Sequence, residues 1–227
     1  TSSEGKKQHG ISFLLIDMHA PGVTVKPIIT LDVPRAGEQE INTVYLEDVK
    51  VPKENLVGEE GKGWTCAKYL LEFERGNAYS PGLAEGLRGV EEIARSEPDR
   101  DQPLLEDPAF RAKVDRTWVE IRALEYTELR ILSSLSAGQN VGPESSLLKT
   151  RGTELQQRIT ELATEAVGHY GLPFDGTTAD AGDNVDVPGP AHAVGHAQDY
   201  FNTRKTSIYA GSNEIQRNIM AKLVLGL

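Results

Sequence analysis

A carboxylate stands among apolar residues in the stretch Leu70–Ala78, which reads Leu-Leu-Glu-Phe-Glu-Arg-Gly-Asn-Ala. At helical spacing, Glu74 shares a face with Leu70 and Ala78. An ionised group in an apolar stripe is costly unless it is paired or used. Desolvation raises the proton affinity of such a carboxylate, which suits a general base. The ordinary alternative is a charge at the stripe's edge that reaches solvent or pairs with Arg75.

Long helices are predicted to position this residue. The first covers residues 64–96, follows a glycine-rich turn, and is expected to kink at Pro81. Hydrophobic periodicity predicts four more helices, over residues 107–135, 144–167, 196–206 and 213–225. Between the third and fourth helix, residues 171–195 are rich in Gly, Pro and Asp, which predicts a long loop.

The first sixty residues have a different pattern. Apolar and alternating stretches at residues 10–18, 23–29 and 40–51 predict three antiparallel strands without intervening helices. The predicted fold is therefore mainly α, with a helical bundle of the four-helix up-and-down type after the end of a small antiparallel β-domain. We expect the β-part at residues 1–60 and the helical domain at residues 61–227.

Composition limits the classes of function. The 227 residues carry a net charge of -10, which disfavours nucleic acid or an anionic membrane surface as a main partner. No apolar run is long enough for a membrane span. Cys66 is the only cysteine, so an intrachain disulfide is impossible, and a reducing cytoplasm is expected. His192 and His196 are four residues apart, but no third ligand is placed near them, so no metal site is predicted.

The chain begins with Thr1 rather than Met, and its three predicted strands make a thin sheet. We therefore expect a C-terminal fragment whose partner strands lie upstream.

Several motifs resemble the acyl-CoA dehydrogenase family, flavoproteins that introduce a double bond next to an acyl thioester. Residues 49–64 resemble the family's passage from the β-domain into its C-terminal helices. Residues 208–217, Ile-Tyr-Ala-Gly-Ser-Asn-Glu-Ile-Gln-Arg, resemble its Tyr-Glu-Gly-Thr-x-x-Ile-Gln-Arg signature. Residues 165–171, Glu-Ala-Val-Gly-His-Tyr-Gly, resemble its Gln-x-x-Gly-Gly-x-Gly motif. The order and spacing of these motifs fit nearly the whole chain.

One departure from the signature bears on catalysis. Many members use the Glu of Tyr-Glu-Gly as the base, and Ala210 stands at that place here. In a second group, similar to isovaleryl-CoA and long-chain acyl-CoA dehydrogenases, the base precedes an Arg on the first helix of the C-terminal domain. Glu74-Arg75 matches that arrangement, so we interpret Glu74 as the base. Arg75 and Tyr209 are expected near the substrate, Arg75 in a structural role and Tyr209 in packing.

The resemblance implies a reaction and its participants. The base takes the α-proton of an acyl-CoA, a hydride passes from the β-carbon to FAD, and the thioester oxygen gains negative charge. By resemblance, that oxygen is stabilised by the backbone N–H of Ala210 and by a ribityl hydroxyl of the flavin. The implied electron acceptor is electron-transfer flavoprotein, the implied assembly is a homo-oligomer (dimer or homotetramer), and the implied process is fatty acid metabolism.

Two further segments resemble flavin-binding positions. Ser212 and Glu214 match residues that meet the flavin dinucleotide at a helix N-terminus, although Ser212 is also an ordinary helix cap. Arg100 matches the Arg of the family's Arg-x-x-Phe-Gly element, with Pro103 and Leu104 in place of Phe-Gly. A solvated loop Arg is the alternative.

The motif at residues 165–171 supplies the other candidate flavin contacts, Gly168, Gly171 and Glu165. Glu165 stands where the family often has Gln, and His169 replaces a Gly. A carboxylate beside a pyrophosphate is unfavourable, so this motif departs from the family pattern.

The sequence leaves four alternatives to the function of a dehydrogenase. A non-catalytic partner subunit of a heteromeric dehydrogenase would share the fold and bind flavin poorly. An acyl-CoA oxidase would pass electrons to oxygen. If the chain were a helical interaction module, nothing would explain why Glu74 is present while Ala210 stands in place of the signature's Glu. A DNA-associated relative is disfavoured by the net charge.

Overall fold

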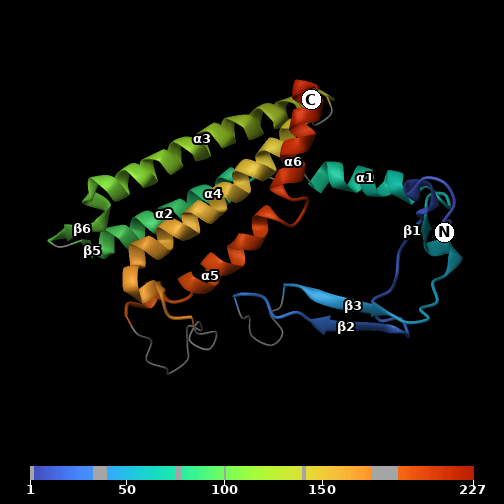
Figure 1. Ribbon diagram of the computed structural model, residues 1–227, viewed down its shortest axis with the longest axis horizontal. Helices are drawn as coiled ribbons and strands as arrows, with labels where there is room; N and C mark the ends of the chain where they lie inside the picture. The colour runs from blue at the N-terminus through green and yellow to red at the C-terminus, as the bar shows by residue number, and fades with distance from the viewer. Residues whose placement is uncertain (1–2, 33–39, 75–77, 100, 140–141, 175–188) are drawn as a thin grey trace. The chain divides into compact units, whose positions relative to one another are not determined.

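The computed structural model describes residues 3–32, 40–74, 78–99, 101–139, 142–174 and 189–227 (Figure 1). The chain divides into two compact units, residues 1–29 with 36–77, and residues 30–35 with 78–227. The predicted domains, residues 1–60 and 61–227, remain a proposal for the complete protein.

The first unit contains two short antiparallel pairs of strands and one helix. Strand β1 (Phe13–Leu14) pairs with β4 (Leu56–Val57), and β2 (Val23–Pro27) pairs with β3 (Asn42–Leu46). The three strands expected from the sequence are thus shorter than predicted, and β4 was missed because it follows a 3₁₀ turn at Lys53–Asn55. Both faces of the β2–β3 pair leave large apolar side chains exposed, among them Val25, Val44, Tyr45 and Leu46.

The helix expected over residues 64–96 is two helices, and this prediction was wrong. Helix α1 (Gly63–Glu74) ends at the predicted base, and α2 (Ser80–Ser96) begins six residues later. Pro81 lies in the first turn of α2, where its missing N–H costs nothing, instead of at a kink. Ala78 is therefore not on the same helix as Glu74, and the Leu70 side chain is 50% exposed.

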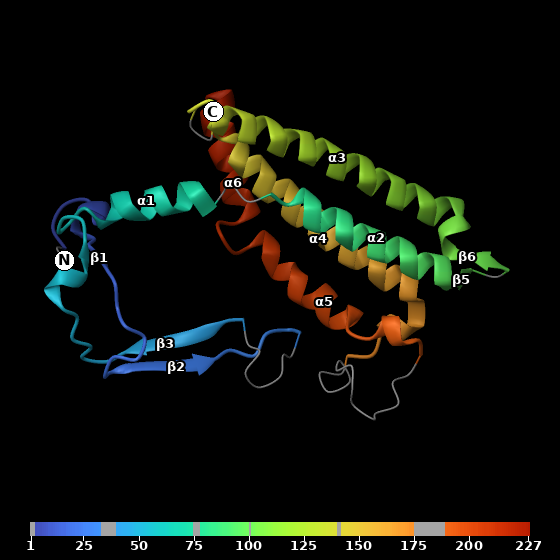
Figure 2. The same ribbon diagram turned by 180° about the vertical axis from the view of Figure 1, so that it is seen from behind.

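The second unit is a bundle in which α4 (Glu144–Val167) contacts α2, α3 (Pro108–Ser136), α5 (His196–Thr203) and α6 (Asn213–Met220). Figures 1 and 2 show α4 lying alongside α2 and α5. A hairpin, β5 (Pro98–Asp99) with β6 (Gln102–Pro103), and a 3₁₀ turn at Leu104–Glu106 join α2 to α3, where the sequence predicted only a loop. This bundle after short antiparallel strands confirms the predicted fold class.

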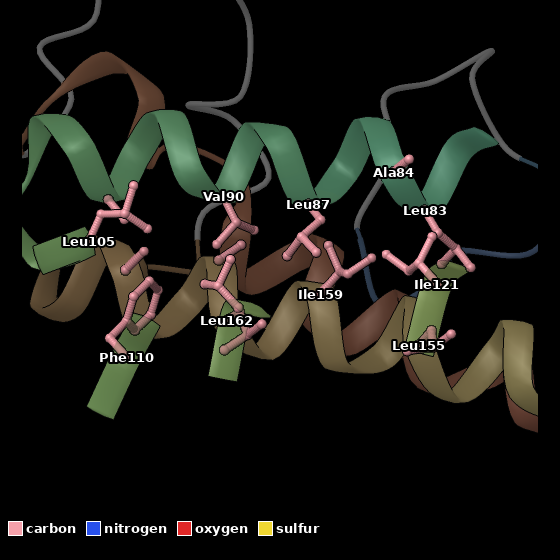
Figure 3. Close-up of a cluster of buried hydrophobic side chains, with 14 of the residues drawn as sticks. Leu83, Ala84, Leu87, Val90, Leu105, Phe110, Ile121, Leu155, Ile159 and Leu162 are labelled. Carbon is pink, nitrogen blue, oxygen red and sulfur yellow. The ribbon is translucent and has the colours of Figure 1, made fainter. Parts of the chain in front are cut away.

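The core of the bundle is apolar and lies between α2, α3 and α4 (Figure 3). Leu87, Val114 and Leu155 are almost completely buried there, one from each helix. Full burial of such a side chain contributes about 1.5–3 kcal/mol. The other core residues are Leu83, Ala84, Val90, Ala94, Leu105, Phe110, Ile121, Leu124, Leu148, Ile159, Leu162, Ala163 and Ala166.

The ends of α3, α4 and α6 follow local signals. Asp107 accepts a hydrogen bond from the Phe110 amide at 2.7 Å, and Pro108 takes the first helical position. Helix α4 has the predicted ends, and α6 starts after Ser212 as predicted, with a π-helical turn over Ala221–Leu225. Within the predicted loop, residues 175–188 lie outside the described residues. No helix in the described ranges is long and apolar enough to cross a membrane.

Gly152 of α4 gives Tyr79 the space it occupies beside the start of α2. A Cβ at this position would fall on the Tyr79 ring. We therefore expect Gly152→Ala to lower the free energy of unfolding by about 1–3 kcal/mol, although alanine is the better helix former. Urea unfolding followed by tryptophan fluorescence measures the change, because one of the two tryptophans, Trp118, lies in the same bundle.

The matched control is Gly89→Ala in α2, where a Cβ meets nothing within 4 Å. It should leave stability unchanged or raise it by about 0.5–1 kcal/mol. A Gly152→Ala protein as stable as Gly89→Ala would show that the Tyr79 contact is not restrictive.

Candidate functional site

The predicted base ends a helix of the first unit. Glu74 is the last residue of α1, and its side chain lies outside the described residues, as does Arg75. Arg100 also lies outside them. The roles predicted for these three residues therefore stay predictions.

The turn that contains Ala210 is held in an unusual backbone conformation. Ala210 has φ = 52°, in the left-handed region that a non-glycine residue adopts at a cost of roughly 1 kcal/mol or more, and Gly211 follows with φ = 85°. The Ala210 amide N–H makes no hydrogen bond to another described residue. The turn thus presents a donor that is free for a ligand.

Gln216, in the first turn of helix α6, contacts the loop turn that contains Ala210. Its side chain is only 1% exposed, and its Nε2 donates to the carbonyl oxygens of Ala210 at 3.5 Å and Gly211 at 3.4 Å. A Cβ at Gly211 would lie 2.5 Å from that nitrogen and displace the Gln216 amide, and the positive φ of Gly211 favours glycine at this position. The sequence prediction did not single out Gln216.

Ser212 caps α6, and its partners are local. Its Oγ accepts from the Ile215 amide at 3.5 Å. The pKa of Glu214 is lowered, first by a hydrogen bond from its own backbone N–H and then by the Ser212 hydroxyl, so its carboxylate is charged. The predicted contact of Ser212 and Glu214 with a dinucleotide remains a proposal.

Buried polar side chains join α4 to α6. Lys149 is 5% exposed, and its Nζ donates to Asn213 Oδ1 at 2.8 Å. Asn213 Nδ2 donates to Thr153 Oγ1 at 3.2 Å. Burial lowers the pKa of the Lys149 ammonium, and the nearby Glu214 carboxylate opposes this effect. This contact fixes the first residue of α6 on the bundle.

Replacing Asn213 with Leu is expected to destabilise the protein by about 2 kcal/mol, because the Lys149 ammonium loses its buried acceptor. Adding Lys149→Met should recover part of that loss, since the buried charge is removed as well. Urea unfolding of the wild type, the two single variants and the double variant measures the coupling. Strictly additive effects would contradict a stabilising contact.

Lys149 also predicts a pH dependence. Its pKa in the folded protein lies below the ordinary value of 10.5, so the unfolded state binds more protons between the two values. Stability should therefore rise with pH across that window, and Lys149→Met should remove this part of the rise.

The residues of the motif at 165–171 lie at the other end of α4. Glu165 Oε1 pairs with Lys113 Nζ at 2.6 Å beside a cleft of about 410 Å³ between α3 and α4. Gly168 has φ = 58°, and a Cβ there would meet nothing, whereas a Cβ at Gly171 would lie 2.6 Å from a Val167 methyl group. Sixteen residues of α4 separate Lys149 from Glu165, which is about 24 Å. The described candidate residues therefore form two separate groups.

Tyr79, at the start of α2, was also missed by sequence reasoning. Burial raises the pKa of its hydroxyl, and Tyr209 and Glu128 add to the effect. Tyr209 itself is 50% exposed. The start of α2 is thus linked electrostatically to Tyr209, which precedes Ala210.

Comparisons with known proteins agree with this architecture. Residues 61–225 match the sequence model of the acyl-CoA dehydrogenase C-terminal domain. Acyl-CoA dehydrogenase IpdE1 of Mycobacterium tuberculosis is 30% identical over 100% of this chain and 53% of its own length. Acyl-CoA dehydrogenase FadE26 of the same organism is 31% identical over 100% of this chain and 54% of its own.

A solved structure of known fold also resembles this chain. The ChsE4–ChsE5 complex from Mycobacterium tuberculosis matches 99% of this chain and 55% of its own chain, with a TM-score of 0.76 and 27% identity. The chain spans about half the length of the curated relatives it matches. It belongs to the acyl-CoA dehydrogenase family and contains that family's C-terminal domain.

Proposed function

We propose that the full-length protein is an FAD-dependent acyl-CoA dehydrogenase of which this chain is the C-terminal half. The observation that carries the proposal is the free amide N–H of Ala210 on a fixed turn. A backbone donor persists when the signature's Glu side chain is lost. The presence of Glu74 before Arg75 compensates for that loss.

In the proposed reaction, Glu74 removes the α-proton of an acyl-CoA thioester. Negative charge then grows on the thioester oxygen, and the Ala210 N–H donates to it. Tyr209 packs beside the substrate, and Arg75 supports the base. A dry pocket raises the pKa of a carboxyl group, which matches Glu74 to its task.

The residues present fit a dinucleotide. The N-terminus of α6 is the positive end of the helix dipole, and the buried Lys149 ammonium lies beside its first residue, Asn213. At the other end of α4, Lys113 balances the charge of Glu165, and Arg116 and Arg158 line the same cleft. Ser212, Glu214, Glu165, Gly168, Gly171 and Arg100 are the proposed FAD contacts. Bound FAD would accept the hydride that leaves the β-carbon.

The proposed partners follow from the same assignment to an acyl-CoA dehydrogenase. The substrate is an acyl-CoA, the electron acceptor is electron-transfer flavoprotein, and the protein works as a homo-oligomer in the cytoplasm. Exposed apolar side chains on α3, among them Val119, Tyr126, Leu129 and Leu132, support packing of this helix against further protein.

A second candidate function is that of a partner subunit in a heteromeric dehydrogenase. Glu165 and His169, in place of Gln and Gly, favour it because they weaken the resemblance to a flavin site. The similarity to a chain of the ChsE4–ChsE5 complex also favours assembly of two different chains. Glu74 argues against a non-catalytic role.

The test is the flavin content of the purified full-length protein and its turnover of a panel of acyl-CoAs, with 2-enoyl-CoA detected by mass spectrometry. A dehydrogenase contains flavin and forms the enoyl product with electron-transfer flavoprotein. Product formation with oxygen alone would instead identify an oxidase. A protein without flavin that gains activity only with a second chain would favour the partner-subunit function.

A further inference from the structure

The Ala210 turn needs an explanation for its stability. Ala210 and Gly211 both have positive φ, and Tyr209 and Ala210 are exposed, so burial of this turn does not hold it. A left-handed alanine persists only where the surrounding contacts fix it. The described contacts on the turn therefore determine where the Ala210 N–H points.

We propose that Gln216 is a positioning residue that fixes the Ala210 N–H for the thioester oxygen. This inference rests on the proposed function for its role in catalysis. Its structural part, that Gln216 holds the turn, stands on the contacts alone.

The first support is the geometry of the amide. The Gln216 Nε2 donates to two successive carbonyls, those of Ala210 and Gly211. When two successive carbonyls accept hydrogen bonds from the same donor, both must point toward it. This restricts the orientation of the two peptide planes that contain these carbonyls. The Ala210 N–H lies in the preceding peptide plane and is joined to the restrained carbonyl through the φ and ψ of Ala210, so restraint of the carbonyl limits the directions that the donor can take.

The second support is the burial of Gln216. Its side chain is 1% exposed, and its Oε1 has no hydrogen-bond partner among the described residues. A buried amide with an unmatched oxygen is costly, and an apolar residue of the same size would avoid that cost. The amide is thus a poor choice for packing alone and a suitable one for holding the turn.

The third support is that α6 itself is fixed. Asn213, one turn before Gln216, is bound by Lys149 and Thr153 of α4. Gln216 therefore acts from an anchored helix, so the position of its amide is set by the bundle.

The experiment compares Gln216→Met with Gln157→Met in the full-length protein. Gln157 is a matched control, because its Nε2 also donates weakly to two backbone carbonyls, those of Thr203 at 3.5 Å and Arg204 at 3.2 Å. Both variants keep the length of the side chain and lose the amide. Hydrogen exchange of the peptide that covers residues 208–217 reports on the turn without any need for catalysis.

The proposal predicts faster exchange of this peptide in Gln216→Met by about tenfold, and no change in Gln157→Met. It also predicts a kcat about tenfold lower in Gln216→Met with KM within twofold of wild type, since removal of one such donor costs about 10²–10³ and its misplacement costs less. Gln157→Met should keep the wild-type kcat. Gln216→Glu, which places an acceptor against the two carbonyls, should lower kcat further.

Unchanged exchange in Gln216→Met would overturn the proposal, as would a fall in kcat no greater than that of Gln157→Met. A wild-type protein that oxidises no acyl-CoA would sink the proposed function. Exchange at residues 208–217 would then still decide whether Gln216 holds the turn.

Discussion

Replacement of Glu74 by Gln is expected to lower kcat of the full-length protein by at least 100-fold. A general base contributes about 10²–10⁴-fold, and glutamine keeps the size of the side chain while it cannot accept the α-proton. Ala210 offers no carboxylate in the signature motif that could take over. The measurement is steady-state turnover of the best acyl-CoA with excess electron acceptor.

Glu72→Gln is the matched control for this experiment. Glu72 lies two residues earlier in α1, about 200° away around the helix. The Glu72→Gln substitution therefore removes an equal charge from a different face of that helix. Its kcat should stay within a few-fold of wild type. Wild-type turnover in Glu74→Gln, or equal losses in the two variants, would remove Glu74 from the role of base.

Loss of Glu128 is expected to cost the most stability of the substitutions considered, about 3 kcal/mol for Glu128→Leu. Its Oε1 accepts from the backbone N–H groups of Tyr79 at 2.6 Å and Ser80 at 3.1 Å, and its Oε2 accepts from the Ser80 hydroxyl. These donors belong to the first turn of α2, where a helix has no internal partners for its N–H groups. Hydrogen bonds to a charged acceptor contribute more than neutral ones.

Urea unfolding followed by tryptophan fluorescence, to which Trp118 of the bundle contributes, tests this expectation. The control is Glu125→Leu on the same helix, where the carboxylate pairs only with Arg122 in the contacts of the described chain. An exposed pair at this spacing contributes about 0.3–0.5 kcal/mol. A Glu128 variant that loses no more stability than the Glu125 variant would mean that the cap is not needed.

Helices with signals in their own sequence were predictable. Asp107-Pro108 at the start of α3, the glycine break before α4, and Ser212 before α6 each act within a few residues, so the ends they set matched the structure. The division between α1 and α2 was missed because apolar periodicity continues across it. The Glu128 cap joins residues almost fifty positions apart, which no local pattern reveals.

The same limit applies to the candidate site. Motif resemblance singled out Ala210, Ser212 and Glu214 as candidates, since each lies in one short signature. It did not identify Gln216 as a support for the turn, nor the buried Lys149, because their roles come from the packing of α6 on α4. Polar residues on the inner face of a helix run against the hydrophobic pattern that sequence reasoning uses.

The central claim is tested most directly by the visible absorption spectrum of the full-length protein, recorded without oxygen before and after each acyl-CoA is added. We expect a flavin band that at least one thioester bleaches, and bleaching at least 100-fold slower in Glu74→Gln. A protein without a flavin band, or a flavin that no thioester in the panel bleaches, would contradict it.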